Sequence, residues 1–394
     1  MTAEVMDLRA WRGNVDENNG KPLKTMKNLM VYLANVRALG DQIRHNELTG
    51  NIEWDGEPIT DTDLIDIRVI LESEEPPCEF ATQDLYPAIQ RHAKENTYHP
   101  IRDYLGSLKW DKKPRLDKWL ISALGAENTA FNQAVARRSL ISAVARAYEP
   151  GCKVDTVLVL EGPQGVRKST AVATLFGPEY TAESVSLFDQ HNKMVMAMKG
   201  HWVVELAEFV AFFKKDKSAV KGMISMRSDN VVLPYAKMAS NHPRQCIFIG
   251  TINPGNFGYL TDDENRRYWP VTVGKCDTDL LLEHRDQIWA EAVAAYRNNE
   301  QWWLTEEEEV LAKEQVAARA TVHPWDALVE EELAHVDHIT VVEALKRIGV
   351  MKERMDMKEQ FQIGESLRKN GFIKEDKRRM IDGVRAYWWV RKDG

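Results

Sequence analysis

The fold is decided by the stretch from Asp155 to Thr170, DTVLVLEGPQGVRKST. It opens with an apolar run of the length of a buried strand, passes through a glycine-containing turn and enters a helical pattern, STAVATLFG. Backbone N–H groups that converge at a helix N-terminus attract anions, and glycine lets the chain wrap closely around phosphate oxygens. The stretch therefore predicts the phosphate-binding loop of a P-loop NTPase.

The predicted loop consists of Gly162, Pro163, Gln164, Gly165, Val166, Arg167, Lys168, Ser169 and Thr170. Lys168 would supply positive charge for the β- and γ-phosphates of ATP, and Ser169 a hydroxyl ligand for Mg²⁺. Arg167 stands where the general motif has glycine. A positive φ at Arg167 would cost about 1–3 kcal/mol of backbone strain. At a negative φ there would be no such strain, and the backbone N–H of Arg167 could still donate to a phosphate oxygen. A nucleotide loop with impaired turnover, and a turn without nucleotide, are the alternatives.

Two further apolar runs, HWVVEL and RQCIFIGTIN, alternate with helical patterns, as a parallel α/β sheet requires. Glu205 ends the first run, and Glu208 follows one turn later. These carboxylates are candidates for holding Mg²⁺, Glu205 together with Ser169, and for polarising the attacking water. Asn253 follows the second run and is a candidate for hydrogen bonding to water and the γ-phosphate. An exposed strand end and a turn-starting Asn are the alternative interpretations.

Two adjacent arginines, Arg266 and Arg267, lie in an otherwise acidic turn. A planar guanidinium spreads positive charge over a transferring phosphoryl group, so either one suits an arginine finger. Local pairing with Asp262 and Asp263 is the alternative.

The regions on either side of the core differ from it in pattern. We expect a mobile arm at 1–22, a helical N-terminal domain at 23–125 with one short hairpin and a capped helix from about Asp61, the P-loop ATPase domain at 126–320, and a winged-helix-like domain at 321–394. The last prediction rests on two helical stretches followed by two short strands joined at Asp382-Gly383, a good hairpin signal.

Charge and cysteine usage limit the class of protein. The net charge of -8 excludes a surface coated in basic residues, so any contact with nucleic acid must be local. Residues 341–394 hold 14 Lys and Arg against 9 Asp and Glu, a local balance of +5. The four scattered cysteines predict free thiols. With no signal peptide or membrane-spanning run recognisable, we expect a cytoplasmic protein without membrane contact.

Several motifs taken together resemble the virulence-associated E proteins, which are related to superfamily 3 helicases. They are HNELTG, YHPIRDYLGSLKWDKKPRLDKWL, VLEGPQGVRKST, WVVELAE, LPYAKMASNHPRQCIFIGTIN and ENRRYWPV. The resemblance runs from about residue 45 to the C-terminus. It implies a homo-hexameric, AAA+-like ATPase that moves along DNA in the replication of a phage, plasmid or other mobile element. Such proteins are often encoded beside or fused to a primase, and we expect any primase here to be separate.

The resemblance also implies roles for individual positions: Lys168, Ser169, Glu205, Asn253, Arg266 and Arg267. A hairpin before the Asn253 strand, from Tyr235 to Gln245, would carry Lys237 and His242 to single-stranded DNA in the pore of the ring. A plain solvated loop is the alternative for that segment. We expect an ATP-dependent DNA helicase or translocase with Mg²⁺ as cofactor and with duplex DNA at the C-terminal domain. A nucleotide-switched DNA-binding regulator that does not unwind DNA is the rival interpretation.

Overall fold

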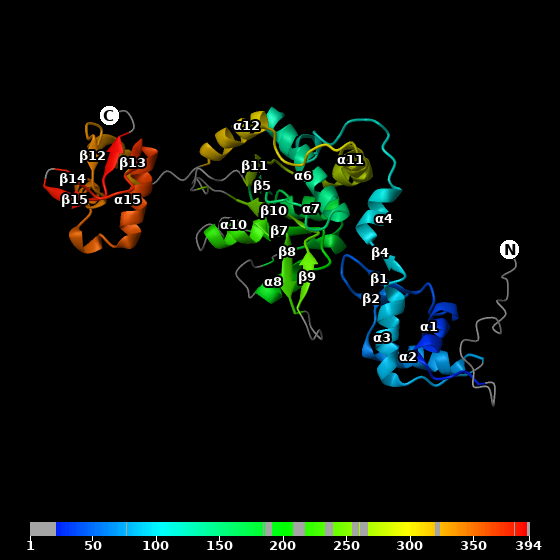
Figure 1. The fold of residues 1–394 in the computed structure, drawn as a ribbon. Coiled ribbons are helices and arrows are strands. Elements are labelled where there is room, and N and C mark those ends of the chain that lie inside the picture. Colours follow the sequence, from blue (N-terminus) through cyan, green and yellow to red (C-terminus); the bar gives the residue numbers. More distant parts are fainter. Residues whose placement is uncertain are drawn as a thin grey trace. The chain divides into compact units, whose positions relative to one another are not determined.

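A computed structural model describes residues 21–75, 77–183, 185, 191–207, 217–232, 239–253, 260, 267–319, 324–381 and 383–391. The arm expected at 1–22 lies outside these residues except for its last two positions. The chain forms two compact units (Figure 1). The first contains nearly all residues up to Ala317, and the second contains Ala318–Gly394 with the segment around Leu260, whose backbone N–H donates to Arg319 O (3.2 Å).

The first unit is built around a five-stranded sheet in which every pair of neighbours is parallel. Its strand order is β11-β5-β10-β7-β6. The bounds are β5 (Val157–Glu161), β6 (Thr181–Ala182), β7 (Val203–Ala207), β10 (Ile247–Ile252) and β11 (Tyr268–Thr272). The expected α/β class with a parallel sheet is confirmed. Strands β5, β7 and β10 are the three apolar runs predicted from the sequence, whereas β6 and β11 were not predicted.

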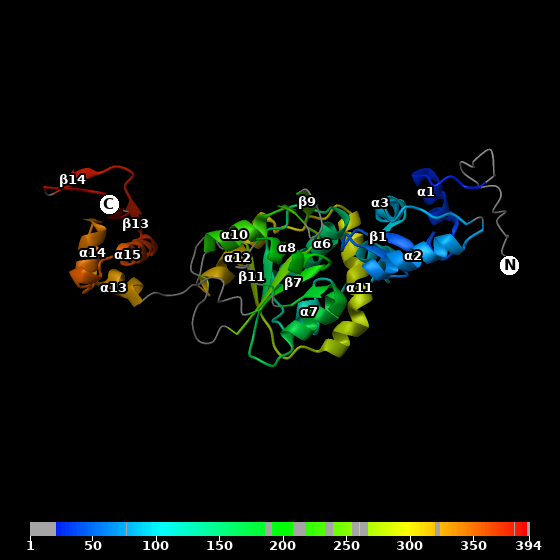
Figure 2. The ribbon, with the colours of Figure 1, turned by 90° about the horizontal axis from the view of Figure 1, so that it is seen from below.

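Helices pack on this sheet through one continuous apolar core. Its central aromatic cluster consists of Phe176, Trp202 and Trp289, with the two indole rings 4.2 Å apart. Figures 1 and 2 show α7 and α11 side by side along the strands. The helices of this region are α6 (Ala130–Tyr148), α7 (Lys168–Phe176), η1 (Pro178–Tyr180), α8 (His191–Met198), α10 (Lys217–Ser225), α11 (Thr278–Arg297) and α12 (Glu306–Ala317).

The N-terminal part of the first unit has its own apolar core. We had expected a helical domain with one hairpin, but this part also contains a sheet. The hairpin is present, but it belongs to a four-stranded sheet of order β3-β2-β1-β4 in which β4 is parallel to β1. The helix from Asp61 is confirmed, with Thr60 and Asp63 forming a capping box. The elements are α1 (Met26–Asn35), β1 (Ile43–Asn46), β2 (Ile52–Trp54), β3 (Glu57–Pro58), α2 (Asp61–Ser73), α3 (Thr82–Ala93), β4 (Thr97–Tyr98), α4 (Pro100–Ser107) and α5 (Trp119–Ser122).

The described residues of the second unit form three α-helices where the sequence predicted two, because a helix also begins at Pro324. Trp389 lies in its core. The order is α13 (Pro324–Glu332), β12 (His338–Ile339), α14 (Val341–Arg347), η2 (Lys352–Arg354), α15 (Met357–Lys369), β13 (Phe372–Lys374), β14 (Arg379–Ile381), β15 (Val384–Ala386) and β16 (Trp389–Arg391). One sheet has the order β12-β16-β13, and β14 pairs with β15 as the predicted hairpin.

All four cysteines are free and buried, as predicted. Among the described residues, none of the helices has the length and apolarity needed to cross a bilayer.

Candidate active site at the carboxyl edge of the sheet

The site lies where the direction of chain connection changes in the parallel sheet. Strand β5 sits between β10 and β11, so the chain leaves β5 for one edge of the sheet and later returns to the other side of it. Ligands of open α/β sheets bind beyond the carboxyl ends of the strands at such a switch point. The loop that follows β5 occupies this position, with Gly162 N–H donating to Ile252 O at the end of β10 (3.1 Å).

Two glycines shape the loop. A Cβ on Gly162 would lie 2.8 Å from the carbonyl oxygen of Val273, so only glycine fits against that backbone. Gly165 has a φ of +85°, which glycine adopts without a steric penalty. Helix α7 then begins without a side-chain cap. Within the described part of the chain, the backbone N–H groups from Gly165 to Thr170 have no hydrogen-bond acceptor, so they are available to an anion.

Lys168 is the first residue of α7, and its ammonium group folds back over the loop. Its Nζ donates to the carbonyl oxygens of Gly162 (2.8 Å) and Pro163 (2.9 Å). Partial burial lowers the pKa of Lys168, while Cys276 and Glu205 act in the opposite direction. It forms no ion pair with any carboxylate that the structure describes. A partly desolvated cation without a counter-ion at a helix N-terminus suits an anionic ligand.

Ser169 and Glu205 meet although 36 positions separate them in the sequence. The Ser169 hydroxyl donates to Glu205 Oε1 (2.6 Å), and the Thr251 hydroxyl donates to the same oxygen (2.6 Å). Glu205 is 2% exposed. We had expected Glu205 at the end of its strand, but it lies inside β7, in register with Ile249 of β10. Thr251 was missed by the sequence analysis; a polar residue inside an apolar strand was the available signal.

Arg167 has the left-handed conformation, with φ +69° and ψ +33°, which decides between the two possibilities left open by the sequence. Steric contact between Cβ and the backbone makes this conformation costly for any residue other than glycine. The loop therefore keeps the backbone path that glycine usually supplies, and arginine bears the strain.

Arg167→Gly is expected to raise the free energy of unfolding by about 0.5–1 kcal/mol, because relief of the left-handed strain outweighs the added entropy of glycine in the unfolded chain. ATP turnover should stay the same or rise. Urea unfolding and steady-state ATPase assays measure the two effects. Arg167→Ala is the control, since it removes the charge and keeps the strain. If both variants lower turnover equally, the guanidinium acts on phosphate and strain is irrelevant to function.

Two other polar residues, Asn253 and Glu161, lie at the same carboxyl edge of the sheet. Asn253 comes directly after β10 and is exposed, so it lies at the same edge as the loop. Glu161, which the sequence analysis did not single out, ends β5 and is buried; its Oε2 accepts from the Thr272 hydroxyl (2.9 Å). Its position immediately before the loop was the available signal. Glu208 lies outside the described residues.

Arg267 lies at the opposite edge of the sheet, directly before β11. Its Nε is 3.2 Å from the Ser225 hydroxyl and 3.9 Å from Asp155 Oδ2. Its carbonyl accepts from Val157 N–H (2.7 Å), which fixes it at the amino edge. Within its own chain, Arg267 is thus not brought to Lys168. Arg266, Asp262 and Asp263 lie outside the described residues.

The segment expected to form a DNA-contacting hairpin is only partly described. Strands β8 (Ser228–Val231) and β9 (Ser240–Pro243) pair antiparallel, with Asp229 opposite His242. His242 Nε2 is 2.8 Å from the Ser240 hydroxyl. Lys237 lies outside the described residues.

The model of the virulence-associated protein E-like domain matches residues 105–321, more than half of the chain. The chain belongs to this family. The virulence-associated protein E-like domain thus takes in the parallel sheet, the loop after β5 and the Ser169–Glu205 pair. It leaves out the hairpin of the N-terminal sheet and nearly all of the second unit.

Solved structures and curated proteins were also compared with this member of the virulence-associated protein E-like family. Two similar structures are described as the apo A form of the NrS-1 C-terminal region. One is 13% identical with a TM-score of 0.41, and the other, of residues 305–718, is 14% identical with a TM-score of 0.42. Each comparison covers 73% of this chain and 78% of the other. No curated protein matches the chain.

Proposed function

We propose that the chain is an ATP-dependent DNA helicase or translocase that serves replication of a phage, plasmid or other mobile element. One observation carries the proposal: the Ser169 hydroxyl and the buried Glu205 carboxylate meet, and Lys168 lies nearby at the N-terminus of α7. This is the donor set that a magnesium–nucleotide complex requires.

The residues present fit Mg²⁺ and ATP. Lys168 and the acceptor-free N–H groups of the loop would hold phosphate oxygens, and Ser169 and Glu205 would hold the cation. Bound Mg-ATP supplies the γ-phosphoryl group that water attacks. Glu205 would orient that water, and Glu208 and Asn253 are further candidates for the same task. Because Glu205 is buried and fixed by two hydroxyls, its carboxylate needs little reorganisation when charge develops.

We further propose an AAA+-like homo-hexamer in which Arg266 or Arg267 completes the site of the neighbouring subunit. The placement of Arg267 at the sheet edge opposite the loop supports this, since it acts on no phosphate at its own site. His242 on β9 would contact single-stranded DNA together with Lys237, and a separate primase would act with the ring.

For the second unit we propose a winged-helix fold that binds duplex DNA. The order α13, β12, α14, α15 and then the four strands β13 to β16, with the β14–β15 hairpin between β13 and β16, supports this proposal. Exposed basic side chains on and beside the hairpin suit phosphate contacts; they are Lys377, Arg378 and Arg385.

A nucleotide-switched DNA-binding regulator is the second candidate. Two observations favour it: Arg167 strains the loop, and Arg267 is held by Asp155 and Ser225 of its own chain. Such a protein would bind ATP, turn it over slowly and respond little to single-stranded DNA.

Glu205→Gln tests the proposed function. A glutamine oxygen accepts the same two hydroxyl hydrogen bonds, so folding and ATP binding should persist, while hydrolysis should fall by about 100-fold or more because the charge is lost. Steady-state ATPase with and without single-stranded DNA provides the measurement. The unmodified chain is expected to be stimulated by the strand.

Glu161→Gln is the matched control, because it neutralises a buried carboxylate on β5, which β10 separates from β7, and it should retain hydrolysis. An equal loss in both variants would mean that Glu205 has no specific role. Absence of stimulation by single-stranded DNA, with normal basal turnover, would favour the regulator.

A further inference from the structure

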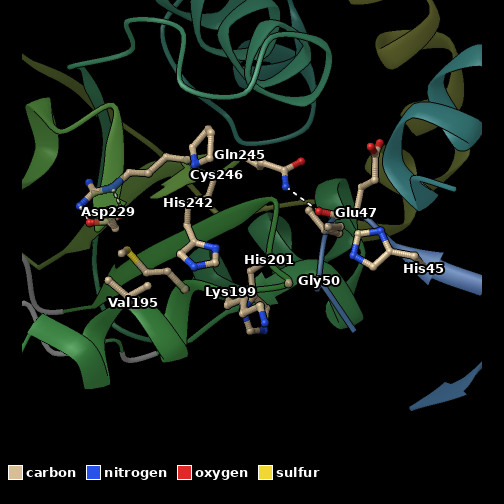
Figure 3. Close-up of a pocket in the computed structure, with 15 residues that line it drawn as sticks. His45, Glu47, Gly50, Val195, Lys199, His201, Asp229, His242, Gln245 and Cys246 are labelled. Carbon is tan, nitrogen blue, oxygen red and sulfur yellow. Dashed lines mark hydrogen bonds and ion pairs between the residues drawn. The ribbon is translucent and has the colours of Figure 1, made fainter. Parts of the chain in front are cut away.

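A cavity of about 300 Å³ lies in the first unit (Figure 3). Three segments line it: the β1–β2 turn, the end of α8 with the turn that follows, and the β8–β9 hairpin with the turn into β10. None of the residues of the loop from Gly162 to Thr170 is among its walls, and Glu205 is not either. The cavity is therefore separate from the proposed nucleotide site.

The two carboxylates at the cavity are already neutralised by arginines. Arg244 forms two hydrogen bonds to Asp229 (2.7 and 2.9 Å), and both side chains are buried. Arg102 Nη1 is 2.8 Å from Glu47 Oε2. Gln245 donates to Glu47 O (2.9 Å), which joins the β1–β2 turn to the chain before β10. The acidic side chains of the wall thus leave little net negative charge in the cavity.

Lys199 has no such partner. No ion pair or hydrogen bond of its side chain is found in the described part of the chain, and desolvation by burial lowers its pKa. Its Cε and Nζ lie 3.3 Å from the position that a Cβ on Gly50 would occupy, so the lysine packs against the β1–β2 turn. A half-buried cation without a counter-ion is unfavourable unless an anion joins it.

Three histidines, His45, His201 and His242, gather around the same cavity (Figure 3). The Nδ1 atom of His201 is buried and has no hydrogen-bond partner among the described residues. The described residues contain no group of three side chains placed to ligate a metal ion. The three imidazoles thus share the wall of the cavity with Lys199.

We infer that this cavity binds a phosphate group, with Lys199 as the charged contact and the imidazoles of His45, His201 and His242 as hydrogen-bond donors. The volume suffices for a phosphate together with part of a nucleotide. The phosphate belongs either to free inorganic phosphate or to the backbone of a single DNA strand, and the chemistry of recognition is the same. Binding of free phosphate goes beyond the proposed function, since no nucleotide at the loop is needed, whereas binding of the strand backbone rests on the proposed contact of His242 with single-stranded DNA.

Protonation of the histidines links this binding to pH. Burial lowers the pKa of all three, and Lys199 lowers those of His45 and His242 further. Glu47 and Glu53 raise the pKa of His45, and Lys94 lowers it. Asp229 raises the pKa of His242. Backbone carbonyls at the end of α8 raise the pKa of His201. An anion stabilises imidazolium, so its binding raises these pKa values. Affinity for a phosphodiester, whose charge is the same at pH 6 and pH 8, should therefore increase as the pH falls.

The experiment measures binding of inorganic phosphate and of a labelled oligothymidylate to the full chain at pH 6 and pH 8, without ATP. Histidine imidazole NMR signals report which rings respond. We expect tighter binding of the oligothymidylate at pH 6, perturbed signals of all three histidines, and affinity lowered about tenfold in Lys199→Ala. Lys199→Gln keeps the length of the side chain and should show the same loss if the first variant folds poorly.

Lys193→Ala is the matched control, because this lysine is exposed on α8, which ends directly before Lys199, and does not line the cavity. A response to phosphate alone identifies free phosphate as the ligand, and a response only to the oligonucleotide identifies the strand backbone. Unchanged histidine signals with both ligands, or an equal loss in Lys193→Ala, overturns the inference. Because ATP is absent throughout, such a failure counts against the cavity and not against the nucleotide site.

Discussion

Lys168→Ala is expected to lower ATP affinity by about 100-fold or more, to the point where binding is hard to detect. Alanine removes the charge aimed at the β- and γ-phosphates, and a charge-assisted contact contributes about 3 kcal/mol, roughly a factor of 100. It also frees the carbonyl oxygens of Gly162 and Pro163 from the ammonium group. Equilibrium binding of a fluorescent ATP analogue with Mg²⁺ measures the loss.

Lys275→Ala is the control for Lys168→Ala. Lys275 is exposed and precedes Cys276, whose N–H donates to Val166 O in the loop (2.9 Å), so its removal takes away one nearby charge without a direct contact. We expect nearly unchanged affinity in this variant and an unchanged melting temperature in both. Unchanged ATP affinity in Lys168→Ala would show that this loop is not the nucleotide site.

Mixing two inactive variants is expected to restore ATPase activity if sites are shared between subunits. Lys168→Ala subunits lack a working site and keep both arginines, whereas Arg266→Ala/Arg267→Ala subunits keep the site and lack the finger. An arginine finger stabilises charge that develops in the transition state, so the double variant should lose about 10³-fold in rate with little loss of ATP binding. In mixed rings the first subunit completes the site of the second, and activity should depend on the mixing ratio.

The structure supplies a control for this experiment. Asp155→Asn removes the carboxylate beside Arg267 without touching the arginine itself. If Arg267 only stabilises its own chain, Asp155→Asn and Arg267→Ala should lower the melting temperature similarly, and mixing should rescue nothing. If mixing restores no activity in rings whose mixed composition is verified by mass, the result would contradict a site shared between subunits. It would favour the nucleotide-switched regulator over the helicase.

Much of the core of the first unit was predictable because its elements carry strong local signals. Strands β5, β7 and β10 are apolar runs, and a parallel sheet buries its strands on both faces. Capping residues placed the start of α2 correctly. Strands β4 and β6 were missed because each has two residues, which show no periodicity. Helix α13 was not among the two helical stretches predicted for the second unit.

The sequence by itself determined the α/β class, the loop after β5 and the residue types of the candidate site, since these depend on local pattern and spacing. Only the tertiary structure decided that Glu205 accepts hydrogen bonds from both Ser169 and Thr251, because parallel register places distant residues side by side. It also decided the positive φ of Arg167, which follows from the path that the loop takes between the ends of β10 and β11. The cavity around Lys199 had no sequence signal, because three segments far apart in the chain form its walls.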